Sequence, residues 1–229
     1  MTLEVDVLTL FPGQFDWVRD SRPVANAIAA GSLRLRVFDL RDHAPGRHRQ
    51  VDDAPYGGGA GMLIRVDAVC VALEGIYGAP VERVLAERRV AVLTPVGRQL
   101  RDEIVTELAG LERLTLLCGR YEGFDQRVHD HLSNDAISIG PYVLSGGEVA
   151  AMAVLDTVTR KLPGALGRDE SHLEDSFSEA LGGRPEYPHY TRPEEFRGWS
   201  VPAVLLSGDH GEVARWRDEQ SHRRAGSQL

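Results

Sequence analysis

The sequence predicts an α/β protein built on a mostly parallel sheet, and two patterns carry that prediction. Short apolar segments, typical of strands covered on both faces, alternate along the chain with longer segments of helical apolar spacing. Three successive apolar segments also run directly into glycine-bearing loops. Because ligands of such sheets bind outside the carboxyl ends of the strands, we expect these loops to form one ligand pocket.

The expected elements follow one another in regular order. The strands are short and apolar, and they lie at residues 3–10, 33–40, 89–93, 114–118 and 136–139. The helices are amphipathic or have recognisable ends, and they lie at residues 21–31, 66–77, 99–109, 124–132 and 148–162. In the first helix, Ser21 suits the N-cap and Gly31 suits the position after the last turn. The helix at 148–162 is apolar nearly all round in its first half, so we expect it to be buried.

The last third of the chain has a different character. Residues 163–193 are rich in glycine, proline and charge without periodicity, which is typical of a linker. Asp209 and Glu212 have the spacing of a capping box and predict a final helix that carries Trp216. We therefore expect a main domain over residues 1–162, an interdomain linker over 163–176 and a small helical domain over 177–229.

Composition limits the classes of protein. The 229 residues are 42% hydrophobic and 26% charged, as in ordinary globular proteins. We find no secretory signal and no run near the roughly 20 apolar residues that span a bilayer. Cys70 and Cys118 lie far apart and fit reduced, buried thiols. We therefore expect a cytoplasmic protein that does not bind membranes.

The net charge of −8 does not indicate a nucleic-acid-binding protein. Any RNA contact must then come from local patches, such as the basic stretch at residues 41–49 or the arginines near the C-terminus. A solvated surface is the simpler explanation of each patch, since such patches are common on proteins. We expect no binding to DNA.

Several common chemistries are not supported. The loop Gly57–Met62 has methionine where a dinucleotide-binding loop needs glycine, and no triphosphate-binding motif is present. Ser145 lacks the surroundings of a hydrolase nucleophile. His129 and His131 are two apart on an expected helix, hence on different faces, so we predict no structural metal site.

The predicted pocket therefore consists of backbone amides, small residues and apolar side chains. Such a pocket suits an adenine-bearing cofactor. It also suits a reaction that needs few protein groups. Methyl transfer is one, because S-adenosylmethionine supplies its own electrophile and the protein supplies position and a base.

Five motifs then carry a family resemblance. They are residues 51–62, residues 119–128 with Gly-Arg-Tyr-Glu-Gly, residues 138–148, residues 188–193 and residues 201–208. Together and in this order they resemble bacterial tRNA (guanine-37-N1) methyltransferases of the SPOUT class. The resemblance implies a SPOUT-type mostly parallel sheet with a trefoil knot in the C-terminal part of the main domain. It also implies a small C-terminal helical domain and a homodimer with active sites at the subunit interface. Nothing in composition or periodicity indicates a knot, and knots are rare.

The resemblance implies that S-adenosylmethionine binds in the strand-end loops. The matching positions are Leu93, Thr94, Pro95, Gly119, Tyr121, Glu122, Ile139, Gly140, Pro141, Tyr142, Val143, Leu144, Gly146 and Gly147. From the residues alone, Tyr142 and Leu144 could equally be core side chains. The resemblance further implies a requirement for Mg²⁺, without a dedicated protein cage.

Two residues match the family's catalytic groups. Asp175 matches the general base that removes the N1 proton of guanine, although its position alone fits a solvated acid in a linker. Arg160 matches the arginine that stabilises charge on guanine O6, although arginine is also favoured at any helix C-terminus. The positions implied for base and RNA recognition are Ser176, His189, Arg192, His48 and Asp52. The chain departs from the family at Glu179-Ala180-Leu181, where the family has Asp-Gly-Leu, and residues 182–187 look lengthened.

The sequence therefore predicts methylation of tRNA at N1 of guanine 37, beside the anticodon, with S-adenosylmethionine as donor. One alternative is a SPOUT methyltransferase that acts on ribose or on a different base. Another is a non-catalytic RNA-binding protein that kept a cofactor pocket. The expected partners are tRNA and a second copy of the chain.

Overall fold

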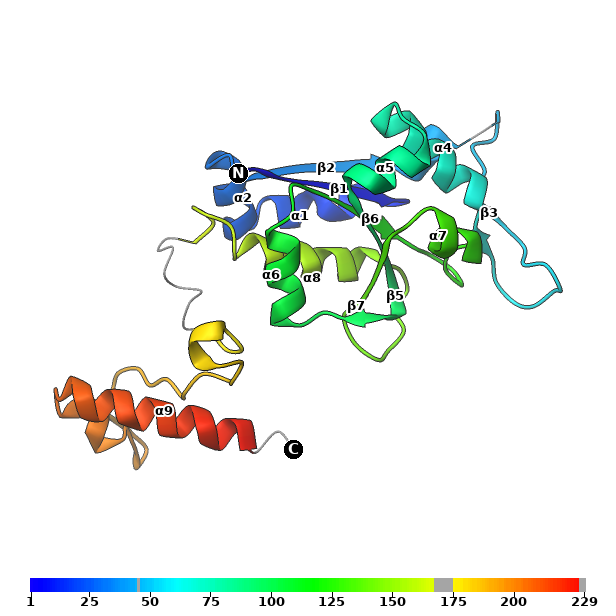
Figure 1. Ribbon diagram of the computed structural model, residues 1–229. Coiled ribbons are helices and arrows are strands. Elements are labelled where there is room, and N and C mark those ends of the chain that lie inside the picture. Colours follow the sequence, from blue (N-terminus) through cyan, green and yellow to red (C-terminus); the bar gives the residue numbers. More distant parts are fainter. Residues whose placement is uncertain (45, 167–174, 227–229) are drawn as a thin grey trace. The chain divides into compact units, whose positions relative to one another are not determined.

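The centre of the computed structural model, which describes residues 1–44, 46–166 and 175–226, is a five-stranded sheet (Figure 1). Its strands are β1 (Leu3–Thr9), β2 (Leu33–Asp39), β5 (Arg89–Gln99), β6 (Arg113–Cys118) and β7 (Asp135–Ser138). They lie in the order β2-β1-β6-β5-β7, and every neighbouring pair is parallel. The predicted α/β class with a mostly parallel sheet is confirmed.

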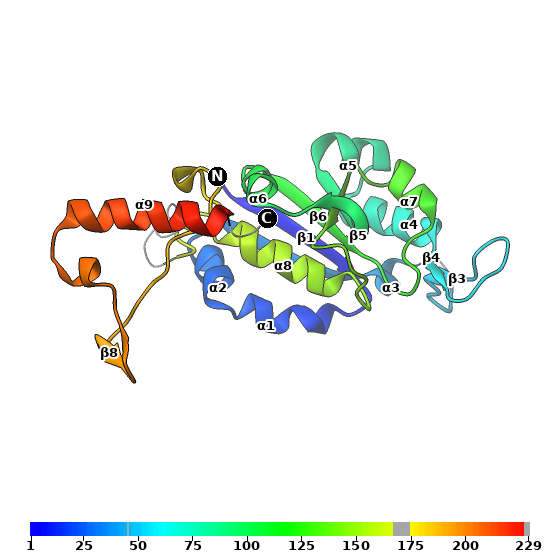
Figure 2. The same ribbon diagram turned by 90° about the horizontal axis from the view of Figure 1, so that it is seen from below.

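Helices cover both faces of the sheet (Figure 1, Figure 2). One face packs against α1 (Asp16–Arg19), α2 (Arg22–Ala29), α6 (Asp102–Ala109) and α8 (Glu148–Thr159), with the turn η1 (Pro12–Phe15). The other face packs against α3 (Leu40–His43), α4 (Val66–Tyr77), α5 (Val81–Glu87) and α7 (Gln126–His131). Successive strand residues alternate between these two cores, as Leu116 and Leu117 do. The strands are apolar on both faces because both faces are buried.

The third expected strand differs most from its prediction. β5 does not end at Leu93 but continues to Gln99 through residues expected to form a loop. Leu93 and Arg98 both pair with Ile137, so the intervening residues bulge out and the strand then resumes. A Cβ on Gly97 would lie 2.6 Å from the backbone of Ile137, so glycine permits this approach. The next helix therefore begins at Asp102 and not at residue 99.

The helix α8 differs in its burial. Ala150, Ala151 and Val154 are buried as expected, but the side chain of Val149 is 55% exposed. The expectation of burial all round is therefore wrong for one face, which the first unit of the chain leaves uncovered. Among the described residues, no helix combines the length and the apolar character needed to cross a bilayer.

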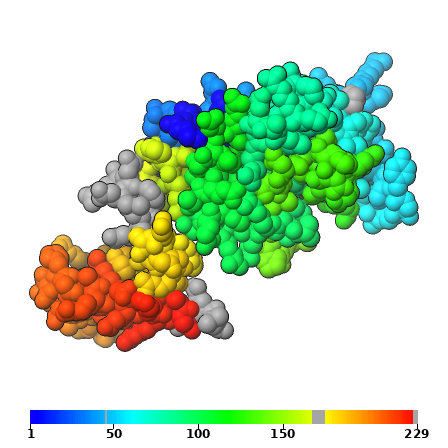
Figure 3. Space-filling view, in the orientation of Figure 1, coloured from blue at the N-terminus to red at the C-terminus, as the bar shows by residue number. Residues whose placement is uncertain are grey.

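A small antiparallel ladder carries the glycine-rich loop. It joins β3 (Asp52–Asp53) to β4 (Leu63–Ile64), and residues 54–62 connect the two strands. Figure 3 shows the segment around these residues, in cyan, standing out at one end of the first unit. Four glycines of the loop have positive φ, including Gly61 at +88°.

The chain divides into two compact units, Met1–Asp169 and Glu170–Leu229. The described elements of the second unit are η3 (Glu179–Leu181), β8 (Glu195–Phe196), β9 (Trp199–Ser200), η4 (Ala203–Leu206) and α9 (His210–Gly226). The Asp209 carboxylate accepts the backbone N–H groups of Gly211 and Glu212 at 2.9 and 3.0 Å. The Asp209 half of the predicted capping box is therefore confirmed, whereas the backbone N–H of Asp209 donates to the Ser207 hydroxyl at 3.1 Å and not to Glu212.

The stretch from Asp175 onward, which the composition groups with the linker, is folded. Phe177 and Arg184 close a turn, because the N–H of Phe177 donates to the Arg184 carbonyl at 2.8 Å. The altered tripeptide at 179–181 forms the 3-10 turn η3 inside it. The residues just after this turn are held by helix α9, since the Ser221 hydroxyl donates to the carbonyl of Pro185 at 2.7 Å. The departure from the family motif is thus accommodated in a local turn.

Candidate functional site

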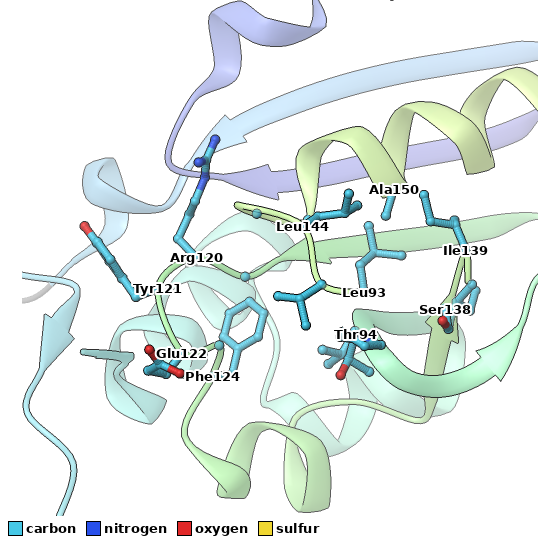
Figure 4. Close-up of a pocket in the computed structure, with 18 of the residues that line it drawn as sticks. Leu93, Thr94, Arg120, Tyr121, Glu122, Phe124, Ser138, Ile139, Leu144 and Ala150 are labelled. Carbon is cyan, nitrogen blue, oxygen red and sulfur yellow. The ribbon is translucent and has the colours of Figure 1, made fainter. Parts of the chain in front are cut away.

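A pocket of about 380 Å³ opens where three parallel strands end (Figure 4). Its walls are the bulged part of β5, the loop after β6 and the loop after β7, with the first turn of α8 behind them. The volume lies in the range of small-molecule sites. The carboxyl ends of the strands therefore form one concave site, as the sheet topology requires.

The pocket brings the predicted cofactor positions together. Those that line it are Leu93, Thr94, Pro95, Gly119, Tyr121, Glu122, Ile139, Gly140, Tyr142, Val143, Leu144, Gly146 and Gly147. Pro141 does not line the pocket and is exposed. Leu93, Ile139 and Leu144 present apolar side chains to the cavity (Figure 4).

Several lining residues were not predicted. They are Val92, Arg120, Gly123, Phe124, Gln126, His129, Ile137, Ser138 and Ala150. Arg120 and Ser138 lie inside the quoted motifs, next to predicted positions. Gln126 and His129 are three residues apart on α7 and so share a helix face, a spacing that could have placed both on the pocket side. Ala150 gave no such signal, because a small apolar residue on a buried helix is ordinary core.

Two glycines allow the loops after β6 and β7 to touch. The N–H of Gly147 donates to the carbonyl oxygen of Gly119 at 2.8 Å. A Cβ on Gly147 would lie only 2.8 Å from the Cα of Cys118, and one on Gly119 would lie 3.1 Å from the Phe124 ring. The backbones meet directly, so their amides and carbonyls form part of the pocket wall.

Glu122 is the one acid among the lining residues. Its backbone N–H donates to the carbonyl of Met62 at 3.0 Å, which ties the pocket to the projecting glycine loop. Gly61 makes room for the carboxylate, since a Cβ there would lie 2.6 Å from Oε1. The pocket therefore offers one carboxylate in a setting of backbone and apolar groups.

Cys118 lies behind the pocket and is fully buried. Burial raises the pKa of its thiol well above the usual range, and the negative charge of Glu148 adds to the effect. The thiol is therefore neutral at physiological pH and is not a nucleophile. It belongs to the core that supports the β6 loop.

The two predicted catalytic residues lie in different units of the chain. Arg160 follows the last residue of α8, is half-buried and does not line the pocket. Asp175 belongs to the second unit and is half-buried, and its carbonyl accepts the N–H of Ser178 at 3.1 Å. The first unit alone therefore does not contain both groups.

The predicted RNA-contacting residues are divided in the same way. His48 and Asp52 belong to the first unit, where His48 is exposed and Asp52 pairs with Ile64. The others, Ser176, His189 and Arg192, belong to the second unit. The hydroxyl of Ser176 accepts the N–H of Glu186 at 3.0 Å, whereas His189 and Arg192 are exposed.

Metal-ligand clusters were sought over residues 1–44, 46–166 and 175–226. Within these ranges, no three His, Cys, Asp or Glu side chains come together in a way that could hold a metal ion.

The sheet, the strand-end pocket and its glycine walls define an α/β protein with a small-molecule site at the carboxyl edge of its strands. The family model described as tRNA (Guanine-1)-methyltransferase TrmD matches residues 3–228. The chain therefore belongs to the tRNA (guanine-1)-methyltransferase family.

Individual relatives agree with this assignment. The tRNA (guanine-N(1)-)-methyltransferase of Dehalococcoides mccartyi strain BAV1 is 47% identical over 222 residues, which cover 97% of this chain and 87% of that protein. The protein of the same name from Geobacter sulfurreducens is 46% identical over 219 residues, covering 96% and 86%. That of Listeria innocua is 42% identical over 222 residues, covering 97% and 88%.

Proposed function

We propose that the protein transfers a methyl group from S-adenosylmethionine to N1 of guanine 37 in tRNA. The observation that carries this proposal is the pocket at the ends of β5, β6 and β7 in a chain of the tRNA (guanine-1)-methyltransferase family. The pocket unites positions that come from three separate segments. Because the proposed substrate is tRNA, we also propose that the protein acts in the cytoplasm.

The residues of the pocket suit this donor. Backbone groups around Gly119 and Gly140 can bond to an adenine edge, and Leu93, Ile139 and Leu144 offer it apolar surface. Glu122 offers a carboxylate to the ammonium group of the methionyl part. When bound, the donor supplies an activated methyl group.

Asp175 and Arg160 would then act on the guanine. The Asp175 carboxylate removes the N1 proton as the bond from N1 to the methyl carbon forms and the bond from that carbon to sulfur breaks. The Arg160 guanidinium stabilises the negative charge that develops on O6. We propose that Ser176, His189 and Arg192 hold the base and its neighbours, with His48 and Asp52 near the RNA.

A Mg²⁺ ion fits the pocket only in a limited way. Magnesium prefers oxygen ligands and usually keeps several waters, so one or two carboxylates suffice. Glu122 is the acid that the pocket supplies. Because Glu122 is assigned to the ammonium group of the donor, we propose a mostly hydrated Mg²⁺ ion without a dedicated protein cage, which would offset negative charge beside the reacting groups.

The chain path supports the proposed knot. After β7, at the edge of the sheet, residues 140–147 return to the end of β6, on the far side of β5. The bulge of β5 between Leu93 and Arg98 forms an arch whose residues Thr94 and Pro95 line the same pocket as Gly146 and Gly147. We propose that residues 140–147 pass through this arch, which makes the trefoil knot of the SPOUT class. The second unit would be its small tRNA-binding domain.

An exposed apolar face supports the proposed homodimer. A groove between α1 and α8 is lined by the apolar residues Trp17, Val149, Met152 and Ala153 and by the polar residues Gln14 and Asp156. Trp17 is 64% exposed and Val149 is 55% exposed. An apolar face of this kind is typical of a contact between subunits. We propose that a second copy covers it and brings its own linker to the site.

The experiment that tests the activity uses two tRNA transcripts, one with G and one with A at position 37. The protein is incubated with each and with S-adenosylmethionine labelled in the methyl group. We expect label in the G37 transcript alone. Equal labelling of both would contradict the specificity for position 37. No labelling of either would favour the non-catalytic RNA-binding alternative.

A further inference from the structure

The carboxylate of Glu148 is buried although it begins a helix beside a loop. Glu148 is the first residue of α8 and is 1% exposed. Its Oε1 accepts the hydroxyl of Thr9 at 2.7 Å, and its Oε2 lies 3.0 Å from Nε of Arg120. A buried carboxylate is costly unless it is paired, so this pair holds a defined position.

Arg120 joins this carboxylate to both pocket loops. It belongs to the loop after β6, yet its guanidinium donates to the carbonyl of Ser145, in the loop after β7, at 3.2 Å. The same guanidinium lies 4.4 Å from the centre of the Phe11 ring. The N–H of Phe11 in turn donates to the Thr9 hydroxyl at 3.0 Å. The charges therefore link the end of β1 to the two loops.

Gly146 leaves the space for this arrangement. A Cβ there would lie 2.5 Å from Oε2 of Glu148 and would collide with Nε of Arg120. Arg120 and Gly146 also form an isolated antiparallel bridge. The ion pair thus crosses the place where the two loops touch, and Arg120 and Gly146 both line the pocket.

We propose that the buried Glu148–Arg120 ion pair, held by Thr9, positions the loops after β6 and β7 and thereby sets the affinity of the pocket for the methyl donor. Glu148 is a positioning residue, because it acts through Arg120 and does not itself line the pocket. The inference rests on the proposed cofactor site. It predicts an effect on donor binding that exceeds the effect on the chemical step.

The test is Glu148→Gln, which keeps the shape of the side chain and removes its charge. We expect the Kd of S-adenosylhomocysteine, measured by calorimetry on the full chain, and the KM of S-adenosylmethionine to rise about tenfold or more, because the neutral amide no longer forms an ion pair with Arg120. We expect kcat at saturating donor to fall less than about threefold, because the interaction does not involve the reacting atoms.

A second pair of variants covers the case in which Glu148→Gln does not fold. Thr9→Val removes the hydroxyl that holds Glu148 and keeps the shape, whereas Thr9→Ser keeps the hydroxyl. We expect weaker donor binding in Thr9→Val and wild-type binding in Thr9→Ser. Val69→Ala, in the core of the opposite face of the sheet, serves as a control that lowers Tm without touching the pair.

The outcomes separate this inference from the proposed function. Wild-type affinity in Glu148→Gln or Thr9→Val would overturn the positioning role alone. So would an affinity loss no larger than that of Val69→Ala at the same Tm decrease. A wild-type protein that neither binds S-adenosylhomocysteine nor methylates tRNA would overturn the proposed function and this inference with it.

Discussion

The backbone N–H of Gly147 donates a 2.8 Å hydrogen bond to the carbonyl oxygen of Gly119, so two loops that are distant in the sequence form one wall of the pocket. Gly147 has an ordinary helical φ of −75°. What it needs is space, because a Cβ would lie 2.8 Å from the Cα of Cys118. The requirement for glycine here is purely steric.

Gly147→Ala should therefore separate the two loops. We expect a loss of about 1–3 kcal/mol in the free energy of unfolding, as for other overpacked sites, together with weak donor binding. Urea denaturation and calorimetry measure the two effects. The control is Gly110→Ala in the cap of α6, where a Cβ would make only ordinary contacts, the nearest at 3.5 Å. Equal behaviour of the two variants would contradict the close approach.

Asp175→Asn tests the proposed base. We expect kcat to fall by about 10²–10⁴-fold, the usual contribution of a general base, with donor binding unchanged. Single-turnover methylation and calorimetry on the same preparation measure both. Glu179→Gln, an exposed acid in the same segment, is the control for loss of charge. A fully active Asp175→Asn would show that another group takes the proton.

Trp17→Asp tests the proposed subunit contact. A charge in the groove between α1 and α8 should oppose burial by a second copy, so we expect a monomer in sedimentation velocity and no methylation. Val71→Asp, on an exposed position of α4 across the sheet, should leave the dimer intact. A wild-type monomer, or a dimeric Trp17→Asp variant, would contradict the contact.

A buried polar cluster on the α4 side of the sheet predicts that the stability of the protein depends on pH. The Tyr77 hydroxyl donates to Asp6 Oδ2 at 2.9 Å and lies 2.8 Å from the hydroxyl of Thr115. Arg88 also donates to Asp6, at 2.7 Å. Burial, and next the charge of Asp6, raise the pKa of Tyr77 above its ordinary value.

The sign of the effect follows from that direction. A raised pKa in the folded state means that folding favours the protonated phenol, so its stabilisation is complete below the unfolded pKa of about 10. It is lost as pH rises through the higher folded pKa. We expect Tyr77→Phe to lose about 1 kcal/mol of stability at pH 8 and to show a smaller decline above pH ~10 than wild type. Urea denaturation of both proteins at pH 8 and at several pH values above ~10 measures the two declines. Parallel declines would contradict the assignment.

The sequence predicted the position of the pocket because strand ends and glycines can be located from local patterns. The bounds of α4 were predicted correctly for the same reason, since its apolar spacing is regular from Val66 to Tyr77. The contact of Gly147 with Gly119 was not predictable, because it joins segments that only the tertiary fold brings together. The glycine pattern predicted where the loops lie in the sequence, but it did not predict which loops contact each other.

The two main differences have physical causes. Residues 94–97 contain proline and glycine and so resembled a turn, but β7 pairs with β5 on both sides of the bulge and draws it back into the sheet. Val149 has an apolar side chain that predicted burial, yet burial by one chain requires a neighbour that the first unit does not supply. Strand pairing and the packing of a helix face against its neighbours are long-range properties, and local sequence patterns do not encode them.

The central claim is the transfer of a methyl group to N1 of guanine 37, and mass spectrometry of the product tests it most directly. A tRNA transcript with G37 is incubated with the protein and S-adenosylmethionine, digested to short fragments and nucleosides, and analysed. We predict 1-methylguanosine in the fragment that contains position 37 and in no other fragment. A methyl group on ribose, on another base or at another position would contradict the claim.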